Sequence, residues 1–203
     1  MTQQLLENEL DPNPFGQFSR WFADAKQQQP HLPEAMTVAT CGTDGRITAR
    51  VCLLKDFDER GFVFYTNYNS RKAEHIHENP RVALCFFWPV DDRQVRIEGA
   101  AVKVTEEESD AYWATRPRGS QLGAWTSSQS SVVSCGRGDL EQRFRELETT
   151  YRELAIPRPP HWGGYRVIPV ELEFWQGRPD RLHDRMRYRL REPKDWIIER
   201  LAP

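Results

Sequence analysis

The chain has 203 residues, of which 38% are hydrophobic and 29% are charged, and this length predicts one domain that buries its own core. Its net charge of −2 disfavours a general nucleic-acid binder. No apolar run reaches the roughly 18 residues of a membrane helix, so we expect no membrane span, and we also expect no N-terminal signal peptide. Its four cysteines form no Cys-x-x-Cys pair, so we expect neither a metal site nor a redox motif. Reduced thiols of this kind are typical of the cytosol, and we therefore expect a soluble cytoplasmic protein.

The first half of the chain predicts one helix followed by short strands. Asn13-Pro14 is typical of a helix start, apolar residues follow at helical spacing, and the helix should end before Pro30. The segment 42–45 has the composition of a hairpin turn, and Ser70 is placed to cap a short helix that ends before Pro80. The strands expected in this half cover residues 35–40, 47–54, 61–66, 82–88 and 94–104.

The second half predicts two helices and three further strands. The segment 105–108 forms a capping box that opens a helix ending before Pro117. Asp139 with Gln142 opens a second helix, which runs towards Ala155. The strands expected in this half cover residues 164–175, 181–191 and 196–201.

The order of these elements indicates the fold class. Strands and hairpin turns dominate and no strand–helix alternation repeats, so we expect a mainly antiparallel β-barrel with peripheral helices. Residues 156–160 are expected to be an extended connection within a single domain that covers residues 1–203, with residues 1–12 as a flexible N-terminus. Neither the Gly-x-Gly-x-x-Gly motif nor the phosphate-loop motif occurs, so the common nucleotide-binding folds have no support.

A cation or a histidine stands at every second position near the end of the chain. If this segment is a strand, these side chains share one face and the opposite face is mostly apolar. The alternating residues are Arg181, His183, Arg185, Arg187, Arg189 and Arg191. Such a strand would suit an anionic ligand that also has a ring, and the alternative is the solvated face of an edge strand.

Two further pairs of cations are placed where a phosphate would suit them. Arg50 and Lys55 bracket an apolar strand, and period-two geometry points them to opposite faces, so one of them should face inward or into a cleft. Arg71 and Lys72 fall in the first turn of a helix, where the macrodipole disfavours positive charge unless an external anion binds there. Solvent exposure is the alternative for this second pair.

A third cluster combines a ring, a guanidinium and a hydroxyl group. Tyr112 and Arg116 are one helical turn apart and share a face, and Ser120 follows just beyond them. Together they would form a small phosphate pocket. A packed aromatic ring beside a surface arginine is the alternative.

Several strings of the chain follow one known order, from about Asn13 to Pro203. They are Arg50 to Lys55, Gly61 to Asn67, Ser70 to Ala73, Arg93 to Ile97, Ser120 to Trp125, Trp162 to Val167, Glu173 to Arg178 and Arg181 to Arg185. With these strings the chain strongly resembles the pyridoxamine 5′-phosphate oxidase family, the FMN enzymes of vitamin B6 metabolism. The resemblance implies an FMN-binding split β-barrel that forms a homodimer, with each FMN held between two subunits.

The resemblance also implies which residues bind the cofactor. Arg50, Arg71 and Lys72 would hold the FMN phosphate, and part of the site would come from the second subunit. The full implied set is Arg50, Val51, Cys52, Leu53, Leu54, Lys55, Tyr65, Thr66, Arg71, Lys72, Gln94, Gln129, Ser130, Trp175 and Arg185.

The implied substrate site has a phosphate part and a ring part. Its residues are Lys55, Tyr112, Arg116, Ser120, Arg181, Leu182 and His183, of which the first four would hold the substrate phosphate. Arg181 and His183 are the implied catalytic residues. Arg181 would orient and cover the substrate ring, whereas His183 would either bond to a ring substituent or assist a proton transfer.

The implied reaction is the oxidation of pyridoxamine 5′-phosphate and pyridoxine 5′-phosphate to pyridoxal 5′-phosphate, with O2 as acceptor and H2O2 as product. FMN would accept the hydride, while the protein supplies orientation and electrostatics. One alternative is a flavin oxidase of another small aromatic molecule, as in the phenazine pathway. These enzymes share the fold but look less similar around Tyr112, Arg116 and Ser120. A second alternative is a non-catalytic flavin or pyridoxal-phosphate binder.

Overall fold

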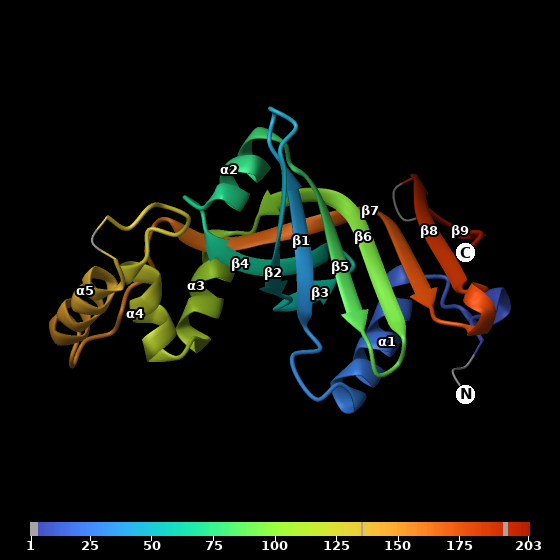
Figure 1. Cartoon of the computed structure of the whole chain (residues 1–203), viewed down its shortest axis with the longest axis horizontal. Helices are drawn as coiled ribbons and strands as arrows, with labels where there is room; N and C mark the ends of the chain where they lie inside the picture. Colours follow the sequence, from blue (N-terminus) through green and yellow to red (C-terminus); the bar gives the residue numbers. More distant parts are fainter. Residues whose placement is uncertain (1–3, 135, 193–194) are drawn as a thin grey trace.

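The computed structural model describes residues 4–134, 136–192 and 195–203, within which nine strands form one antiparallel sheet (Figure 1). The strand order is β2-β1-β5-β6-β7-β4-β3, and β8 and β9 extend the sheet from β7. The strands are β1 Ala35–Cys41, β2 Ile47–Leu53, β3 Asp56–Asp58, β4 Gly61–Asn67, β5 Arg81–Trp88, β6 Arg93–Lys103, β7 Trp162–Gln176, β8 Asp184–Glu192 and β9 Asp195–Arg200. The helices are α1 Pro14–Gln28, α2 Arg71–Glu78, α3 Glu106–Thr115, α4 Arg118–Thr126 and α5 Arg137–Thr150, with short 3-10 helices η1 Glu7–Glu9 and η2 Pro179–Arg181.

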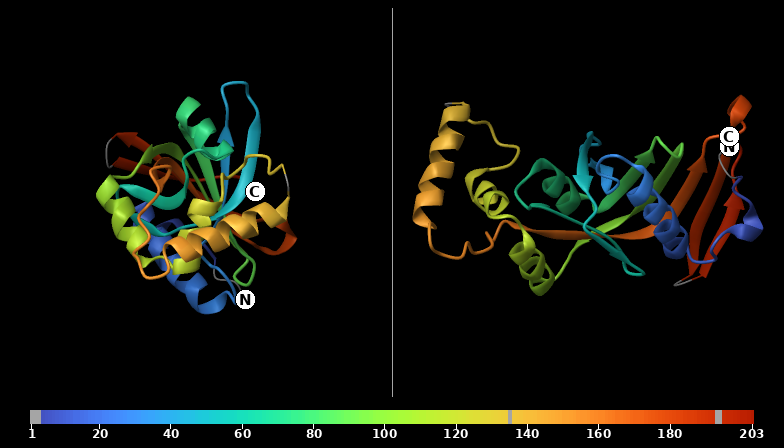
Figure 2. Two further views of the ribbon diagram at one scale, coloured as in Figure 1. Left: turned by 90° about the vertical axis from the view of Figure 1, so that its left-hand side faces the viewer. Right: turned by 90° about the horizontal axis from the view of Figure 1, so that it is seen from below.

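The long strand β7 connects two parts of the molecule. Its residues 162–167 pair with β4 and its residues 171–176 pair with β8, while β6 pairs along both halves. Figures 1 and 2 show α3, α4 and α5 at one end of the molecule and β8 with β9 at the other. Residues near the two ends of β7 therefore belong to different regions of the structure.

The main core lies between the curled sheet and helix α1. Burial alternates along β1, where Met36 and Val38 are buried, as expected for a strand with one face towards the core. Phe18 of α1 is fully buried at the centre of an aromatic cluster. The rings around it are those of Phe57, Phe62, Phe86 and Trp88.

A second, smaller core lies among α3, α4 and α5. Trp113, Ile156 and Trp162 are buried there. The indole N–H of Trp113 donates to Ile156 O at 2.8 Å, and that of Trp125 donates to Pro157 O at 2.8 Å. These bonds attach the extended connection after α5 to both α3 and α4.

Most of the predicted elements are present, and one predicted cap is not. The capping box of Thr105 and Glu108 at the start of α3 is confirmed by both of its hydrogen bonds. Ser70 precedes α2, but its side chain makes no capping bond. Instead, Ser70 Oγ accepts a hydrogen bond from Lys72 Nζ at 3.0 Å.

The remaining differences concern short elements and helix ends. Neither α4 nor the three-residue strand β3 was predicted, because elements of this length carry too little periodic pattern. Helix α5 begins at Arg137, and Asp139 lies within its first turn, where a carboxylate is favourable without being the cap. The helix ends at Thr150, before the predicted Ala155.

The N-terminal segment contacts β8 and β9. The Leu5 amide donates to Asp184 Oδ2 at 3.2 Å, and Arg200 Nη2 donates to Leu5 O at 2.8 Å. Tyr188 Oη donates to Asp11 O at 2.7 Å. Of the N-terminus that we expect to be flexible, residues 1–3 lie outside the described residues. Among the described helices, none has the length and apolar character that a membrane crossing requires.

Candidate functional site

A cavity of about 650 Å³ lies among β2, β4, α3 and α4. Its wall contains the cations Arg50, Lys55, Lys72 and Arg116, and none of the described residues that line it is a carboxylate. The other lining residues are Val51, Cys52, Leu53, Tyr65, Thr66, Asn67, Tyr112, Ser120, Gly123, Ala124, Ser127, Gln129 and Trp162. A concave site with converging positive charges and aromatic rings suits an organic anion.

Arg50 lies in β2 with its guanidinium against neutral oxygens. Nη1 donates to Val38 O at 3.0 Å and to Thr40 Oγ1 at 2.9 Å, and Nη2 donates to Thr48 Oγ1. Burial lowers the pKa of this guanidinium, but an arginine remains charged at all physiological pH values. The positive charge of Arg50 is therefore available to a ligand.

Lys72 lies in the first turn of α2 and is only 7% exposed. Its Nζ donates to Thr66 Oγ1 and Ser70 Oγ at 3.0 Å and to Gln129 Oε1 at 3.1 Å. Burial lowers the pKa of Lys72, and the positive charge of Arg50 lowers it further. A buried ammonium group with only neutral acceptors costs free energy that an anionic ligand would offset.

Arg71, the neighbour of Lys72, lies beside a different cavity. It is exposed and lines a second cavity of about 320 Å³ together with Ser130. The two cavities share Asn67 and Gln129 as lining residues. The structure therefore divides the three cations expected to bind one phosphate between two adjoining cavities.

Arg50 and Lys55 both line the first cavity, although we expected them to point to opposite faces. The expectation was wrong because β2 ends at Leu53, so the strand alternation does not continue to Lys55. Leu54, expected among the cofactor residues, is 4% exposed and belongs to the main core, and it does not line the cavity.

Three stacked aromatic rings form another part of the cavity wall. The Tyr65 ring of β4 lies 4.1 Å from that of Tyr112 and 5.3 Å from that of Trp162, with interplanar angles of 18° and 11°. Tyr65 Oη donates to Glu108 O at 3.2 Å. Burial raises the pKa of Tyr65 to about 12, so the phenol stays neutral near pH 7 and adds no negative charge.

Arg116 directly follows α3 and packs on tryptophan rings. Its Cζ lies 4.4 Å from the ring centre of Trp162 and 5.2 Å from that of Trp113. Nη2 donates to Ser120 O at 3.0 Å, whereas Nη1 is buried and has no hydrogen-bond partner among the described residues. Burial lowers the pKa of Arg116. A buried donor without an acceptor is unfavourable, so Nη1 indicates a place for an anionic oxygen of a ligand.

Several other predicted site residues lie together near the far end of β7. Gln94, Trp175 and Arg185 are neighbours in register on β6, β7 and β8. The His183 ring lies 4.7 Å from the Trp175 ring, and its Nδ1 accepts a hydrogen bond from the Arg178 amide at 3.1 Å. None of these residues lines the cavity.

Arg181 and Leu182 precede β8 in an exposed turn. The strand predicted from Arg181 begins instead at Asp184, so Arg181 and His183 do not continue the alternation of β8. Asp180 and Arg181 have φ angles of 58° and 60°, a region in which residues with a Cβ carry backbone strain.

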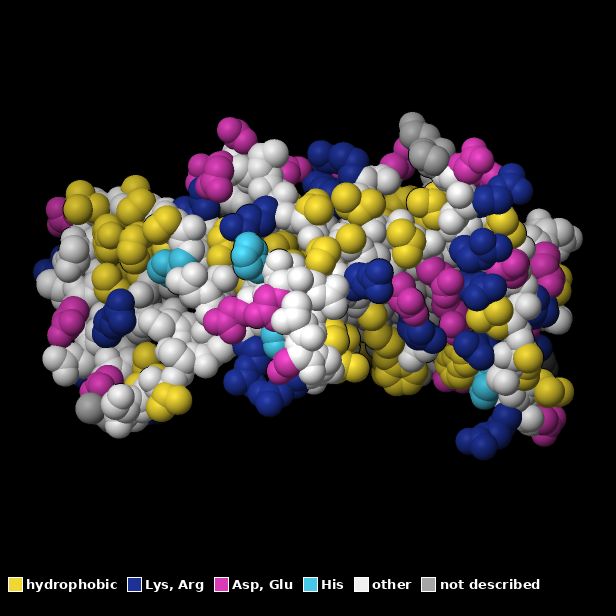
Figure 3. Space-filling model, turned by 90° about the horizontal axis from the view of Figure 1, so that it is seen from above, with side chains coloured by type: hydrophobic (Ala, Val, Ile, Leu, Met, Phe, Trp, Pro, Cys, Tyr) yellow, Lys and Arg dark blue, Asp and Glu magenta, His cyan; other side chains and the backbone are white. Residues whose placement is uncertain are grey.

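The arginines within β8 do not form a free cationic face, and this part of the prediction was wrong. Carboxylates from neighbouring strands pair with them. The ion pairs are Arg185–Glu173, Arg187–Glu199, Arg189–Glu199 and Arg191–Asp195, with N–O distances of 2.9, 2.7, 3.5 and 2.7 Å. Figure 3 shows basic and acidic side chains lying next to one another over this end of the molecule. The opposite face is buried as predicted, with Met186 and Tyr188 fully enclosed.

Gln94, Trp175, His183 and Arg185, with the turn that contains Arg181, are called the Trp175 group below. Within one chain, the cavity and the Trp175 group are far apart along β7. Trp162, which lines the cavity, is the first residue of the strand, and Trp175 is next to its last. The strand has 15 residues, which at about 3.3 Å per residue make it roughly 50 Å long if straight. The predicted site residues therefore form two groups in the chain.

Sequence reasoning missed five of the residues that line the cavity. They are Asn67, Gly123, Ala124, Ser127 and Trp162. Ser120 and Gly123 share a face of α4, and Ser127 follows four residues later, directly after the helix end. Prediction of α4 as a helix would have identified this face.

Two family profiles together match most of the chain. The family described as "Pyridoxamine 5'-phosphate oxidase" matches residues 22–158. The family described as "Pyridoxine 5'-phosphate oxidase C-terminal dimerisation region" matches residues 162–203, the part that contains β7, β8 and β9.

Curated proteins named "Pyridoxine/pyridoxamine 5'-phosphate oxidase" are similar over almost the whole chain. The protein from Gloeothece citriformis is 56% identical over 199 residues, which are 98% of this chain and 92% of the relative. The protein from Rubrobacter xylanophilus is also 56% identical over 199 residues, with 98% and 91% covered.

Solved structures confirm the predicted split-barrel fold. PhzG from Burkholderia lata, in complex with tetrahydrophenazine-1-carboxylic acid, has a TM-score of 0.92 at 33% identity and covers 100% of this chain and 99% of its own. A pyridoxamine 5'-phosphate oxidase-related, FMN binding protein from Nostoc punctiforme has a TM-score of 0.74 at 17% identity, with 96% and 100% covered. Profiles, relatives and fold agree that this chain belongs to the pyridoxine/pyridoxamine 5′-phosphate oxidase family of oxidoreductases.

Proposed function

We propose that this protein catalyses the FMN-dependent oxidation of pyridoxamine 5′-phosphate and pyridoxine 5′-phosphate to pyridoxal 5′-phosphate, with O2 as acceptor and H2O2 as product. The observation that carries the proposal is a cavity with four cations and no lining carboxylate among the described residues. Two dianionic phosphates, one on the cofactor and one on the substrate, require two sets of cations. Arg50 and Lys72 would form one set, and Lys55 and Arg116 the other.

The first set fits the phosphate of FMN. Lys72 is buried among neutral acceptors and Arg50 donates to neutral oxygens, so an anion would complete both environments. Arg71 would reach the same phosphate from the adjoining cavity. When bound, FMN would accept a hydride from C4′ of the substrate and pass its electrons to O2. The alcohol substrate would give the aldehyde directly, whereas the imine formed from the amine substrate would take up water and release ammonia.

The second set fits the substrate phosphate. The unpartnered Nη1 of Arg116 would donate to a phosphate oxygen, with Lys55 and the Ser120 hydroxyl in the same cavity. Tyr112, stacked on Tyr65, would limit the space beside this phosphate.

We further propose that the active unit is a homodimer in which the cavity of one subunit meets the Trp175 group of the other. The separation of the two groups along β7 supports this arrangement, and so does the match of residues 162–203 to a family part described as a dimerisation region. Arg181 of the partner subunit would then orient the substrate ring. His183 of the partner subunit would hydrogen-bond to a ring substituent or move a proton.

An apolar outer face of the sheet supports the same proposal. Apart from Arg81 at the start of β5, the residues that alternate with the core side chains of β1, β2 and β5 are small or apolar, and Val51 and Phe87 are 67% and 57% exposed. Val51 also lines the cavity. Apolar surface of this kind typically marks a protein–protein interface, and a second copy seated here would adjoin the cavity.

An oxygen-uptake assay with the FMN-loaded protein tests the reaction. Pyridoxamine 5′-phosphate should drive O2 consumption with formation of H2O2 and pyridoxal 5′-phosphate, and the purified protein should release FMN and not FAD. A protein that cannot be reconstituted with FMN, or that consumes no O2 with either phosphorylated substrate, would contradict the proposal.

Complementation between two inactive variants tests the shared site. Lys72→Met damages the cavity and Arg181→Ala damages the other group, so each homodimer should have little activity. In mixed dimers one site combines the intact cavity with the intact Arg181, so random reassembly should recover about a quarter of wild-type activity. If both groups served one site within a chain, mixing would restore nothing.

A second candidate function is the oxidation of a phenazine precursor, because PhzG superposes on the whole chain with a TM-score of 0.92. The unpartnered Nη1 of Arg116 and the neighbouring Lys55 favour a phosphorylated substrate. Oxygen uptake with a reduced phenazine carboxylic acid, but not with pyridoxamine 5′-phosphate, would establish the second function instead.

A further inference from the structure

We propose that Arg166 of β7 is a positioning residue for the substrate phosphate, because it ties the strand after Lys55 to the helix that precedes Arg116. This inference rests on the proposed function, which assigns Lys55 and Arg116 to that phosphate. Arg166 is 7% exposed and does not line the cavity. It therefore acts through its neighbours and not by contact with the ligand.

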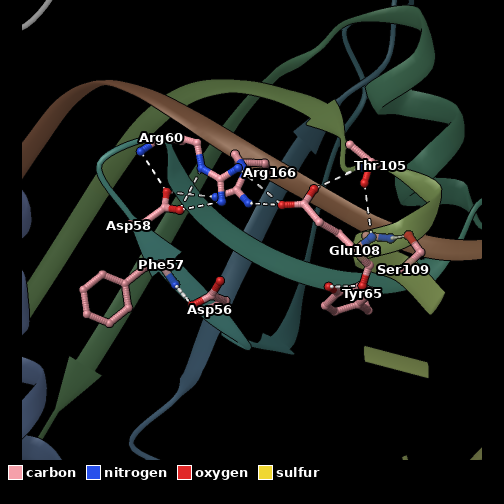
Figure 4. A network of polar contacts seen from close by, with 10 residues as sticks. Asp56, Phe57, Asp58, Arg60, Tyr65, Thr105, Glu108, Ser109 and Arg166 are labelled. Atoms are coloured by element: carbon pink, nitrogen blue, oxygen red, sulfur yellow. Dashed lines mark hydrogen bonds and ion pairs between the residues drawn. The ribbon is translucent and has the colours of Figure 1, made fainter. Parts of the chain in front are cut away.

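The Arg166 guanidinium joins two carboxylates from different elements (Figure 4). Nη1 donates to Asp58 Oδ1 at 3.0 Å, and Nη2 donates to Glu108 Oε1 at 2.9 Å. Arg60 also contacts both carboxylates, with its Nε 2.8 Å from Asp58 Oδ2 and its Nη1 3.5 Å from Glu108 Oε1. The Arg60 side chain is 64% exposed and its contacts are screened by solvent, so Arg166 is the buried link between the two acids.

The Asp58 contact restrains the chain next to Lys55. Strand β3, Asp56–Asp58, begins immediately after Lys55, and the Lys55 amide donates to Val63 O at 2.8 Å. With one end of this short strand held at Val63 of β4 and the other held at Arg166 of β7, the backbone position of Lys55 is restricted from both sides.

The Glu108 contact restrains the helix that precedes Arg116. Glu108 lies in the first turn of α3 and its backbone oxygen accepts the hydrogen bond from Tyr65 Oη. Tyr112 follows one turn later, and Arg116 is the residue after the helix end. Arg166 therefore fixes the start of α3 against β4 and β7, and the rigid helix transmits that position to both cavity residues.

Loss of the Arg166 guanidinium would leave Asp58 and Glu108 close together with only the exposed Arg60 between them. Repulsion between the carboxylates would move α3 and β3 apart, which would separate Arg116 from Lys55. The cations proposed for FMN lie on β2 and α2, and their bonds to described residues do not include this network. The expected defect is thus specific to the substrate phosphate.

The test compares Arg166→Met with Arg166→Lys in the FMN-loaded protein. Calorimetric titration with pyridoxal 5′-phosphate and with pyridoxal gives two dissociation constants, and their ratio measures selectivity for the phosphate. Arg166→Met should lower this ratio about tenfold, the size expected when a charge-assisted hydrogen bond is misaligned. Flavin content should match the wild type, KM should rise more than kcat falls, and Arg166→Lys should restore part of the selectivity.

Arg93→Met is the matched control. Arg93 is also a largely buried arginine with two partners, Asp24 and Gln176, at 2.8 and 2.9 Å, and among the described residues neither partner belongs to α3 or β3. It should lower the unfolding temperature without changing the selectivity ratio. A wild-type ratio in Arg166→Met, or an equal loss in Arg93→Met, would overturn the positioning proposal.

Two further measurements distinguish a failure of the positioning proposal from a folding defect and from a failure of the proposed function. If Arg166→Met does not fold, Asp58→Asn and Glu108→Gln each remove one arm of the link, and wild-type selectivity in both would overturn the proposal. If the wild-type protein itself binds pyridoxal as tightly as pyridoxal 5′-phosphate, the proposed function fails first.

Discussion

The cavity and strand β8 both concentrate positive charge, but their cations have different partners. In the cavity, Arg50 and Lys72 donate to carbonyl, hydroxyl and amide oxygens. On β8, Arg187 donates to the Glu199 carboxylate, and the other arginines of the strand are paired in the same way. The arginines of the strand are thus all ion-paired, whereas the cations of the cavity have neutral partners. A cation marks an anion site only where its neighbours supply no carboxylate.

Lys72→Met tests the cavity side of this comparison and should have the largest effect. A charge-assisted bond contributes about 1.5–3 kcal/mol, so FMN binding should weaken by about 10- to 100-fold. The apoprotein should be at least as stable as the wild type, because an ammonium group without a counter-ion is costly to bury. Fluorescence titration with FMN and thermal unfolding of the apoprotein measure the two quantities.

Lys103→Met is the control for this change. Lys103 is exposed, and its ammonium group lies 4.3 Å from the ring centre of Tyr68, outside the cavity. FMN affinity should not change in this variant. Wild-type FMN affinity in Lys72→Met would mean that the buried ammonium group does not hold the cofactor phosphate.

Arg116→Met tests whether the two sets of cavity cations bind different phosphates. It should raise KM for pyridoxamine 5′-phosphate about tenfold or more with a smaller change in kcat, because anchoring a remote phosphate is largely uniform binding. Flavin content should stay at the wild-type level. Steady-state oxygen uptake and the flavin absorbance provide both values, and a loss of flavin with unchanged KM would instead assign Arg116 to the cofactor.

Acid pH should weaken the ion pair between Glu108 and Arg166, and it should leave the charges of the cavity cations unchanged. The Thr105 amide, and then the charge of Arg166, hold the pKa of Glu108 below the ordinary value of 4.5. A depressed carboxylate pKa stabilises the fold fully above pH 4.5, and this contribution is lost as the pH falls through the folded-state pKa. Thermal unfolding should therefore show Glu108→Gln as less stable than the wild type at pH 7, with the difference shrinking below pH 4.5. A constant difference down to pH 3 would contradict this reasoning.

Arg187→Met should have the smallest effect. The side chain pairs with Glu199 at 2.7 Å but is 29% exposed, and solvent-exposed ion pairs contribute little to stability. The unfolding temperature should fall by a few degrees at most, less at high salt, and FMN affinity should remain as in the wild type. A large loss of FMN affinity would show that β8 carries free charge after all.

The local predictions from the sequence held where a side chain acts on its own backbone. Asn13 caps α1 through a hydrogen bond from the Phe15 amide, and the capping box of α3 forms as expected. The buried face of β8 could also be predicted, because Met186 and Tyr188 alternate with charged residues. The expectation that Arg50 and Lys55 point to opposite faces was wrong, because a period-two argument requires the strand to continue and β2 ends at Leu53.

By itself, the sequence determined the fold class through capping residues and alternation along single segments, and it determined the family through its ordered motifs. The resemblance to that family then implied most of the residues that line the cavity. Only the tertiary structure decided which cations are neutralised, because Glu173 and Glu199 reach the β8 arginines from neighbouring strands. It also decided that the Trp175 group lies away from the cavity, since both are attached to opposite ends of β7. Charge pairing and separation in space depend on strands that the fold brings together, and no pattern along one segment encodes them.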